Sequence, residues 1–230
     1  MFISVIIPAL NEEENICGLI VYLKEHGGGL LKEIIVADGG SIDNTVSNAE
    51  KAGASVILCV QKGRAAQMNN GASAASEKIL YFVHADVYPP KTFANDILTA
   101  VENQFDLGRY FMKFKSRKWI LKLNAFITRF DLFACYGGDQ TLFITRTLFD
   151  KVGGFDSSLR IMEDFEFTSR ARKFGRYKIF QKSALISARK YETNSWLKVQ
   201  RANYTVIKMY QKGASQEELI KTYKQMLNYR

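Results

Sequence analysis

The first hundred residues repeat one pattern of apolar and polar positions. Short apolar runs rich in β-branched residues predict strands, and they alternate with longer stretches of helical periodicity. Strands are expected at residues 3–7, 33–37, 55–60 and 78–83, and helices at residues 11–26, 41–51 and 65–76. Because these strands are apolar throughout, they indicate an α/β fold with a mostly parallel sheet that helices cover on both faces.

Polar residues mark the ends of these elements. Asn11 is predicted to cap the first helix, with Glu14 completing a capping box, and the glycine run at 27–29 is predicted to end it. Ligands of parallel α/β sheets bind beyond the carboxyl ends of the strands. Candidate site residues should therefore gather near the loops at 8–11, 38–41, 61–64 and 84–88.

The pattern changes after residue 108. Further strands are expected at 109–115, 141–144, 177–180 and 184–188, and helices at 118–133 and 162–174. Apolar positions from Trp196 to Tyr210 predict a helix that Gly213 ends, and Ser215 with Glu218 predicts a capping box for a last helix. We expect one domain at residues 1–190, whose pattern changes at residue 108, followed by a helical extension at 191–230.

Composition and charge narrow the class of protein. With 230 residues, of which 47% are hydrophobic, the chain is not intrinsically disordered. The net charge of +9 divides into −6 for residues 1–108 and +15 for residues 109–230. No apolar run approaches the roughly 20 residues that a bilayer span needs, and the acidic stretch at 12–14 is unlike a signal peptide. Cys17, Cys59 and Cys135 are expected to be buried, reduced thiols in a cytoplasmic protein.

Several residues at the predicted strand ends could carry chemistry. Asp38 could accept hydrogen bonds from a nucleoside, or it could simply stabilise its turn. The segment around Gly63 and Arg64, at the start of a helix, is suited to a diphosphate. Asp86 could hold a divalent cation, and His84, two residues earlier, would point the same way in an extended segment.

Glu163 and Asp164 open a predicted helix. Acids at this position often complement the helix dipole, and they could equally supply a general base. An aspartate with an ordinary pKa of about 4 is ionised at neutral pH and can take a proton from a hydroxyl group.

Six segments together resemble family 2 glycosyltransferases, which are inverting enzymes with the GT-A fold. They are SVIIPALNE at 4–12, VADGGS at 36–41, GRA at 63–65, FVHAD at 82–86, GDQ at 138–140 and MED at 162–164. The resemblance covers about residues 2–190, and it implies a donor-nucleotide half at 1–108 and an acceptor half at 109–190. The H-A-D sequence also resembles a bacterial subgroup associated with radical-SAM and selenium-related gene neighbourhoods.

The resemblance implies a role for each matching residue. Asp164 would be the catalytic base beside Glu163, and Asp86 would bind Mg²⁺ or Mn²⁺. Gly138, Asp139 and Gln140 would form the acceptor-binding turn. The nucleotide-diphosphate sugar would contact Pro8, Leu10, Asn11, Glu12, Asp38, Gly63, Arg64, His84 and Ala85.

Two departures from the family pattern matter. His84 replaces the first acid of the D-x-D metal motif, and the Q-x-x-R-W motif of processive synthases is absent. Transfer of a single sugar to an unknown hydroxyl acceptor is therefore favoured. The basic half is consistent with an anionic or membrane-surface acceptor, and so with a peripheral position at the inner membrane face.

Two other functions remain open from the sequence. A nucleotidyltransferase that makes sugar nucleotides would share the fold, although an acidic loop follows the first strand where a basic glycine-rich loop is expected. The aromatic and basic stretch at 109–122 could instead belong to a non-catalytic module that binds polyanions or membranes. Acids at three predicted ligand loops argue against nucleic acid as the partner. The oligomeric state is not predicted.

Overall fold

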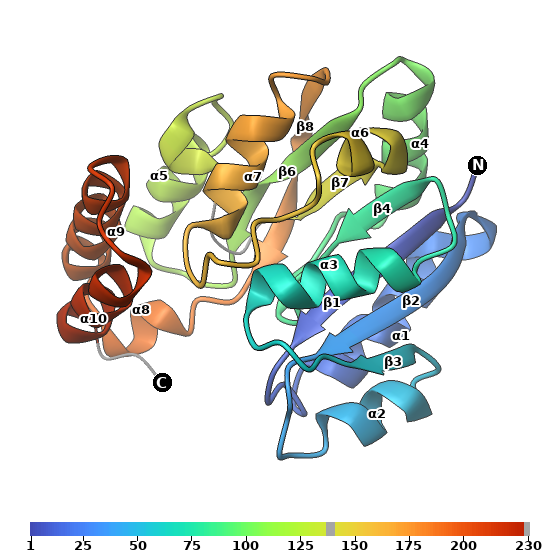
Figure 1. Ribbon diagram of the computed structural model, residues 1–230, viewed down its shortest axis with the longest axis horizontal. Helices are drawn as coiled ribbons and strands as arrows, with labels where there is room; N and C mark the ends of the chain where they lie inside the picture. The colour runs from blue at the N-terminus through green and yellow to red at the C-terminus, as the bar shows by residue number, and fades with distance from the viewer. Residues whose placement is uncertain (137–140, 228–230) are drawn as a thin grey trace.

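The apolar runs of the chain form the strands of one twisted sheet. The computed structural model describes residues 1–136 and 141–227, and within them the strand order is β3-β2-β1-β4-β7-β6-β8-β5 (Figure 1). The strands are β1 (Ile3–Ala9), β2 (Leu31–Asp38), β3 (Ser55–Leu58), β4 (Ile79–Phe82), β5 (Val87–Tyr88), β6 (Leu107–Phe114), β7 (Leu142–Thr145) and β8 (Tyr177–Ile186). Strands β1 to β4 are parallel to one another, as the sequence predicts.

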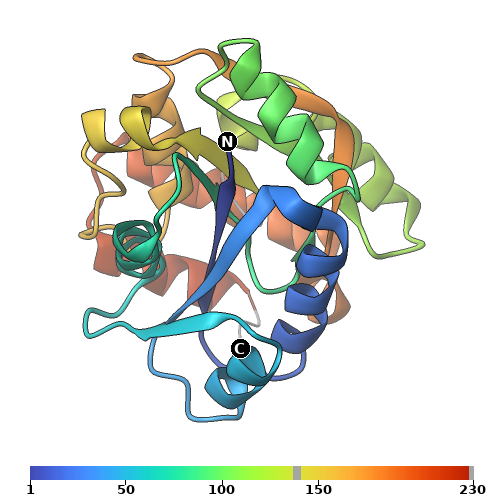
Figure 2. The ribbon, with the colours of Figure 1, turned by 90° about the vertical axis from the view of Figure 1, so that its right-hand side faces the viewer.

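Helices cover both faces of this parallel part (Figure 2). Successive strand residues point to opposite faces, so Val5 packs with Leu19 of α1 (Ile16–Gly27), and Ile6 packs with Met68 of α3 (Arg64–Ala74). Gly71 allows the close approach of α3, because a Cβ atom there would lie 2.4 Å from the Ile6 side chain. Two-sided burial is the reason that these strands are apolar throughout.

The second half of the sheet is mixed. Strands β7 and β5 run antiparallel to their neighbours, whereas β6 and β8 are parallel. The two strands expected at 177–180 and 184–188 are one continuous strand, β8. A register shift opposite Tyr110 and Phe111 lets it stay paired with β6 through the intervening polar residues.

The helices that the sequence predicts differ from those of the structure mainly at their ends. Helix α1 begins at Ile16 rather than near Asn11, and α5 (Trp119–Ile127) is shorter than the helix expected at 118–133. The sequence prediction missed α4, α6 and α8. The other helices are α2 (Thr45–Lys51), α4 (Phe93–Glu102), α6 (Arg146–Lys151), α7 (Glu163–Ala171), α8 (Lys190–Thr193), α9 (Trp196–Gln211) and α10 (Gln216–Met226).

The C-terminal helices pack on the second half of the molecule. The capping box of Ser215 and Glu218 is present at the start of α10, as predicted. Val199 and Ala202 of α9 bury Leu121 of α5, and Leu219 of α10 packs on Met162 just before α7. None of the helices in the described residues is long and apolar enough to cross a bilayer.

The three cysteines do not share one environment. They are free thiols, and only Cys135 is fully buried, whereas Cys59 is partly buried and Cys17 is exposed on α1. The expectation that all three are buried is therefore wrong for Cys17. A position on the outer side of an amphipathic helix is the reason.

Candidate active site

Two loops at the carboxyl ends of β1 and β2 bind each other. The backbone N–H of Asn11 donates to Ser41 Oγ (2.9 Å), and the backbone N–H of Ile42 donates to Asn11 Oδ1 (3.0 Å). Asn11 has a φ of 53°, which asparagine tolerates better than most residues. The predicted capping role of Asn11 is therefore wrong, because its side chain is used to join the two loops. Asn15 occupies the N-cap position of α1 instead.

Asp38 lies at the end of β2 and is almost fully buried. Its carboxylate accepts hydrogen bonds from the backbone N–H groups of Gly40 and Ser41, both at 2.9 Å, and from the Ser41 hydroxyl. Asp38 therefore stabilises its own turn, which is one of the two roles that the sequence allowed. The carboxylate thereby shapes the loop that joins Asn11.

The start of α3 brings together two further polar residues. Gly63 has a φ of 123°, so the turn into the helix requires glycine. Gln67, on the first turn of α3, donates to the carbonyl groups of Ala9 and Ala37 at 2.7 and 2.8 Å. This buried amide links the carboxyl ends of β1 and β2 to the helix that carries Arg64.

His84, Ala85 and Asp86 form a turn between β4 and β5. The backbone N–H of Val87 donates to the carbonyl of His84 (3.0 Å), so the segment is not extended. Because of this turn, the side chains of His84 and Asp86 reach different partners, which corrects the expectation that both point the same way. His84 Nε2 lies 4.0 Å from Asp164 Oδ2.

Asp86 belongs to a cluster that the sequence did not predict. Arg189 follows β8 by three residues, and its Nη2 atom lies 2.8 Å from Asp86 Oδ2 and 3.3 Å from Glu12 Oε1. Burial opposes the charge of Arg189, but the hydrogen bonds and charges of Asp86 and Glu12 outweigh it, so the pKa of Arg189 is raised. One guanidinium therefore neutralises two carboxylates from the ends of β1 and β4.

The start of α7 carries the other candidate acids. Met162, directly before the helix, has a φ of 72°, a strained value that the surrounding packing maintains. Glu163 is buried and accepts a hydrogen bond from Arg64 Nη1 at 3.1 Å. Arg64 and Glu163 come from segments about a hundred residues apart, and their ion pair fixes the position of α7 against the start of α3.

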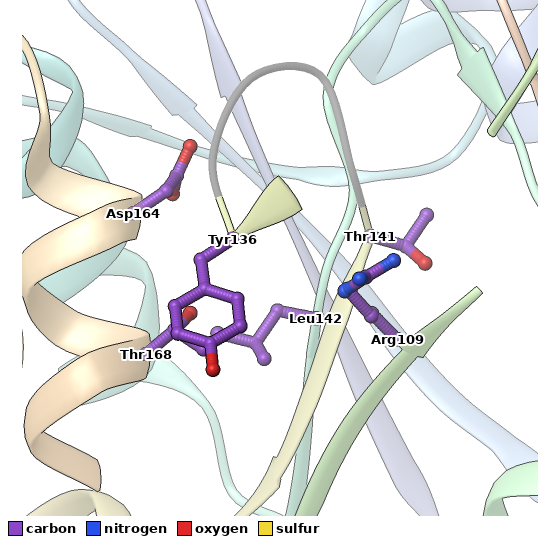
Figure 3. Close-up of a pocket in the computed structure, with 6 residues that line it drawn as sticks. All are labelled: Arg109, Tyr136, Thr141, Leu142, Asp164 and Thr168. Atoms are coloured by element: carbon purple, nitrogen blue, oxygen red, sulfur yellow. The ribbon is translucent and has the colours of Figure 1, made fainter. Parts of the chain in front are cut away.

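Asp164 lines a small pocket together with residues of the mixed part of the sheet. Figure 3 shows Asp164 and Thr168 on α7 facing Leu142 of β7 and Arg109 of β6, and Tyr136 and Thr141 complete the lining. Arg109 is buried, and it donates to Tyr177 Oη (2.7 Å) and to the carbonyls of Thr128 and Phe130. No carboxylate within the described residues lies at ion-pair distance from Arg109.

The remaining predicted site residues have varied positions. Pro8 is buried in β1 opposite Ala37, and Ala85 is buried in the turn between β4 and β5. Leu10 is half exposed beyond the end of β1. Gly138, Asp139 and Gln140 lie outside the described residues.

Metal ligands are sparse around these residues. Within the described part of the chain, no three His, Cys, Asp or Glu side chains gather in a way that could hold a metal ion. However, Glu12 and Asp86 contact the same Arg189 nitrogen atom. The Arg189 guanidinium therefore occupies a position between two carboxylates. A divalent cation coordinated mainly by phosphates and water needs only one or two such carboxylate ligands.

Arg189 and Arg109 were missed because the sequence shows them only as members of a basic region. The rule that ligand-binding residues follow parallel strands could have identified Arg189, which comes directly after the strand predicted at 184–188. No comparable signal marks Arg109, which the sequence places inside a strand.

Comparisons with known proteins agree with this fold. The S. aureus TarS structure in complex with UDP-GlcNAc has a TM-score of 0.64 and 22% identity, over 81% of this chain and 58% of that chain. Glucosyl-3-phosphoglycerate synthase from Mycobacterium tuberculosis, in complex with Mn²⁺, UDP and glucosyl-3-phosphoglycerate, has a TM-score of 0.59 and 19% identity, over 100% of this chain and 81% of that chain. The expected GT-A-like architecture is thus confirmed.

Sequence comparison gives the family. Glucosyl-3-phosphoglycerate synthase from Mycolicibacterium smegmatis is 35% identical over an alignment of 96 residues that covers 38% of this chain and 32% of the relative. The match thus spans about a third of that relative's length. The model of the family described as "Glycosyl transferase family 2" matches residues 4–162, which is more than half of the chain. The chain therefore belongs to glycosyl transferase family 2.

Proposed function

We propose that this protein transfers a sugar from a nucleotide-diphosphate sugar to a hydroxyl group, with inversion at the anomeric carbon. Family membership supports a glycosyltransferase over a nucleotidyltransferase or a non-catalytic module. Structural relatives of the same fold are named as complexes with UDP-GlcNAc or with UDP and Mn²⁺. We further propose that the chain belongs to the H-A-D subgroup, on the basis of residues 84–86.

One observation carries this proposal. In the turn at residues 84–86, the His84 side chain lies beside Asp164. The Asp86 side chain pairs with Arg189, which also contacts Glu12. The candidate base and the candidate charge-binding residues therefore meet at one turn. An in-line displacement needs this arrangement, because the acceptor hydroxyl and the leaving diphosphate lie on opposite sides of the anomeric carbon.

In the proposed reaction, Asp164 takes the proton of the acceptor hydroxyl as its oxygen attacks the anomeric carbon. The bond from that carbon to the diphosphate breaks, and the diphosphate leaves with the electron pair. Arg64 lies at the start of α3 and is held by Glu163 of α7. Its guanidinium stabilises the negative charge that grows on the leaving group. His84 lies beside Asp164 and limits the positions that the carboxylate can take.

Glu12 and Asp86 are the residues that would hold Mg²⁺ or Mn²⁺, after Arg189 has moved away from them. When bound, such a cation neutralises diphosphate charge. Asn11 and Asp38 support the loops that would border the nucleoside, through the hydrogen bonds between the ends of β1 and β2.

The acceptor side is the basic half of the chain, which carries a net charge of +15. We propose an anionic or membrane-surface acceptor and a peripheral cytoplasmic position. The buried Arg109 in the wall of the pocket that contains Asp164 supports an acceptor with negative charge. Transfer activity on the true acceptor should therefore fall as salt screens these charges.

Donor binding tests the first half of the proposal. A thermal-shift panel would compare UDP-glucose, UDP-GlcNAc and GDP-mannose, each with and without Mn²⁺. At a ligand concentration of 100 Kd, binding to the folded state adds about 2.7 kcal/mol, which raises Tm by about 5 °C for a chain of this size. Absence of a response to every nucleotide sugar would contradict the proposed donor class.

The substitution Asp164→Asn tests the base. Release of nucleoside diphosphate from the donor identified by the panel should fall at least about 100-fold, because a positioned base contributes that much or more. Donor affinity from calorimetry should stay within about twofold. Asp150→Asn, at an exposed position on α6, is the matched control and should leave both quantities unchanged. Unchanged turnover in the Asp164 variant would refute its role as base.

A further inference from the structure

Helix α5 carries apolar side chains on both its inner and its outer face. Leu121 and Ala125 face the protein interior, as expected. The outer face is apolar as well: Trp119 is 72% exposed, Leu123 49% and Phe126 50%. Phe130, just beyond the helix, is 50% exposed and contacts Phe126 edge to face.

Trp119, Leu123 and Phe126 form one continuous patch because their spacing of four and three residues places them on one helix face. Contiguous exposed apolar surface of this kind marks an interaction site, whereas single exposed apolar residues are normal. The C-terminal helices do not cover the patch, because Val199 and Ala202 pack on the opposite face of α5, around Leu121.

Cations surround the patch. Residues 109–130 contain seven Lys or Arg residues and no Asp or Glu. Six of these cations are exposed: Lys113, Lys115, Arg117, Lys118, Lys122 and Arg129. Arg129 lies over the rings of Phe111 and Phe126, so one of these charges stands at the border of the apolar patch.

The exposed apolar side chains and the cations around them together indicate the kind of partner. Lysine is depleted at protein interfaces, and a symmetric dimer through this face would bring the same cations together. An interfacial helix with Trp, Leu and Phe on its apolar face and flanking Lys and Arg fits an anionic bilayer. Each exposed Lys or Arg near such a surface adds to the attraction.

Arg109 connects the end of α5 to the candidate active site. Arg109 donates to the carbonyls of Thr128 and Phe130, at the end of α5, and also lines the pocket that contains Asp164. Figures 1 and 2 show α5 at the outer edge of the molecule. A surface bound at α5 would therefore be connected, through Arg109, to the pocket that contains Asp164.

We propose that the outer face of α5 docks onto the surface of an anionic lipid bilayer, with Trp119, Leu123, Phe126 and Phe130 inserted at the headgroup level. The proposal goes beyond the proposed transfer reaction and does not depend on the donor. It assigns a specific surface to the peripheral membrane position suggested by the charge of the second half of the chain.

Vesicle sedimentation of the full chain tests the proposal. The probes are vesicles of phosphatidylcholine alone and of phosphatidylcholine with 30% phosphatidylglycerol (a proportion of about a third gives a strongly negative surface). The parent protein should bind the anionic vesicles much more strongly than the neutral ones. The double variant Trp119→Ser/Phe126→Ser should lose at least about tenfold in partitioning, since each exposed aromatic side chain contributes apolar area. Lys115→Gln/Lys122→Gln should also weaken binding, and more so at low salt than at high salt.

Leu58→Ser is the matched control, because Leu58 is 74% exposed on β3, at the opposite edge of the sheet, and should leave partitioning unchanged. Unfolding curves and donor calorimetry on each variant separate loss of docking from loss of fold or of donor binding. The proposal is overturned by no binding of the parent to anionic vesicles, by equal binding of the Trp119/Phe126 variant, or by a dimer in solution that this variant abolishes. Selective binding of an oligonucleotide at equal charge would also overturn it.

Discussion

Arg189 links the two halves of the molecule through a single side chain. It is more than half exposed, so its ion pairs with Asp86 and Glu12 contribute less than about 1 kcal/mol to stability. Its main effect is electrostatic, because it neutralises two carboxylates at the place where a divalent cation is proposed to bind. Arg189 and a cation would compete for the same oxygen atoms.

This competition gives a prediction for Arg189→Gln. Removing the guanidinium should strengthen Mn²⁺ binding by about three- to tenfold, because a competing charge near the protein surface is lost. Calorimetric titration with MnCl₂ measures the change, and Arg176→Gln, at an exposed position before β8, serves as the control. Weaker Mn²⁺ binding in the Arg189 variant would contradict the idea of a shared position.

Asp86→Ala should have the opposite effect. With Mn²⁺ present, the affinity for the donor nucleotide should fall about tenfold or more, towards the value measured without metal. Calorimetry with and without Mn²⁺ gives both affinities, and Asp150→Ala is the control. Equal affinities in the variant and the parent would show that Asp86 does not contribute to metal-dependent binding.

Three elements meet at the amino end of the sheet through Glu33. Its Oε1 atom accepts hydrogen bonds from Ser4 Oγ on β1 and from the backbone N–H and hydroxyl of Ser76, just after α3, at 2.6 to 2.7 Å. Burial alone would raise the pKa of Glu33, but these hydrogen bonds and the charge of Arg146 outweigh it. The pKa of Glu33 is therefore below its ordinary value.

The lowered pKa gives a pH-dependent prediction at the level of elements. The ionised form is favoured by folding, so its contribution is present above the unfolded pKa of about 4.5 and is lost as pH falls through the folded pKa. Glu33→Gln should therefore cost about 1–2 kcal/mol of unfolding free energy at pH 7, and the difference from the parent should shrink below pH 4.5. Urea unfolding at several pH values tests this, and a constant difference would contradict it.

The C-terminal helices support the candidate active site across the molecule. Gln216, on the first turn of α10, accepts hydrogen bonds from the backbone N–H groups of Arg160 and Ile161 at 3.0 and 3.1 Å. Those residues lead into Met162, whose strained conformation sets the direction of α7 and so the position of Asp164. The helical extension expected at 191–230 is therefore in contact with the segment that leads into the candidate active site, and we propose that it belongs to the functional unit.

Gln216→Ala tests this support. Loss of the two hydrogen bonds should lower the transfer rate about tenfold, because small displacements of a catalytic group are costly, while donor affinity stays unchanged. Gln216→Glu keeps the accepting oxygen and should restore most of the rate. A purely structural role would lower stability without this split between rate and donor affinity, and without rescue by glutamate.

The sequence alone determined the repeated β/α units, because two-sided burial of a parallel strand requires an apolar residue at nearly every position. It also determined the strand-end positions of Glu12, Asp38, Arg64 and Asp86, and the capping box of α10, which depends on residues three apart. Local spacing is sufficient for such features.

Only the tertiary structure decided which of these residues meet. The Arg64–Glu163 pair joins segments 99 residues apart, and the contact between Glu12 and Arg189 joins segments 177 residues apart. The turn at 84–86 and the exposure of the outer apolar face of α5 could not be predicted from the sequence either. Each depends on which side a neighbouring element occupies. No local pattern contains that information, since the packing of distant elements fixes the partners of a side chain and local periodicity fixes only its face.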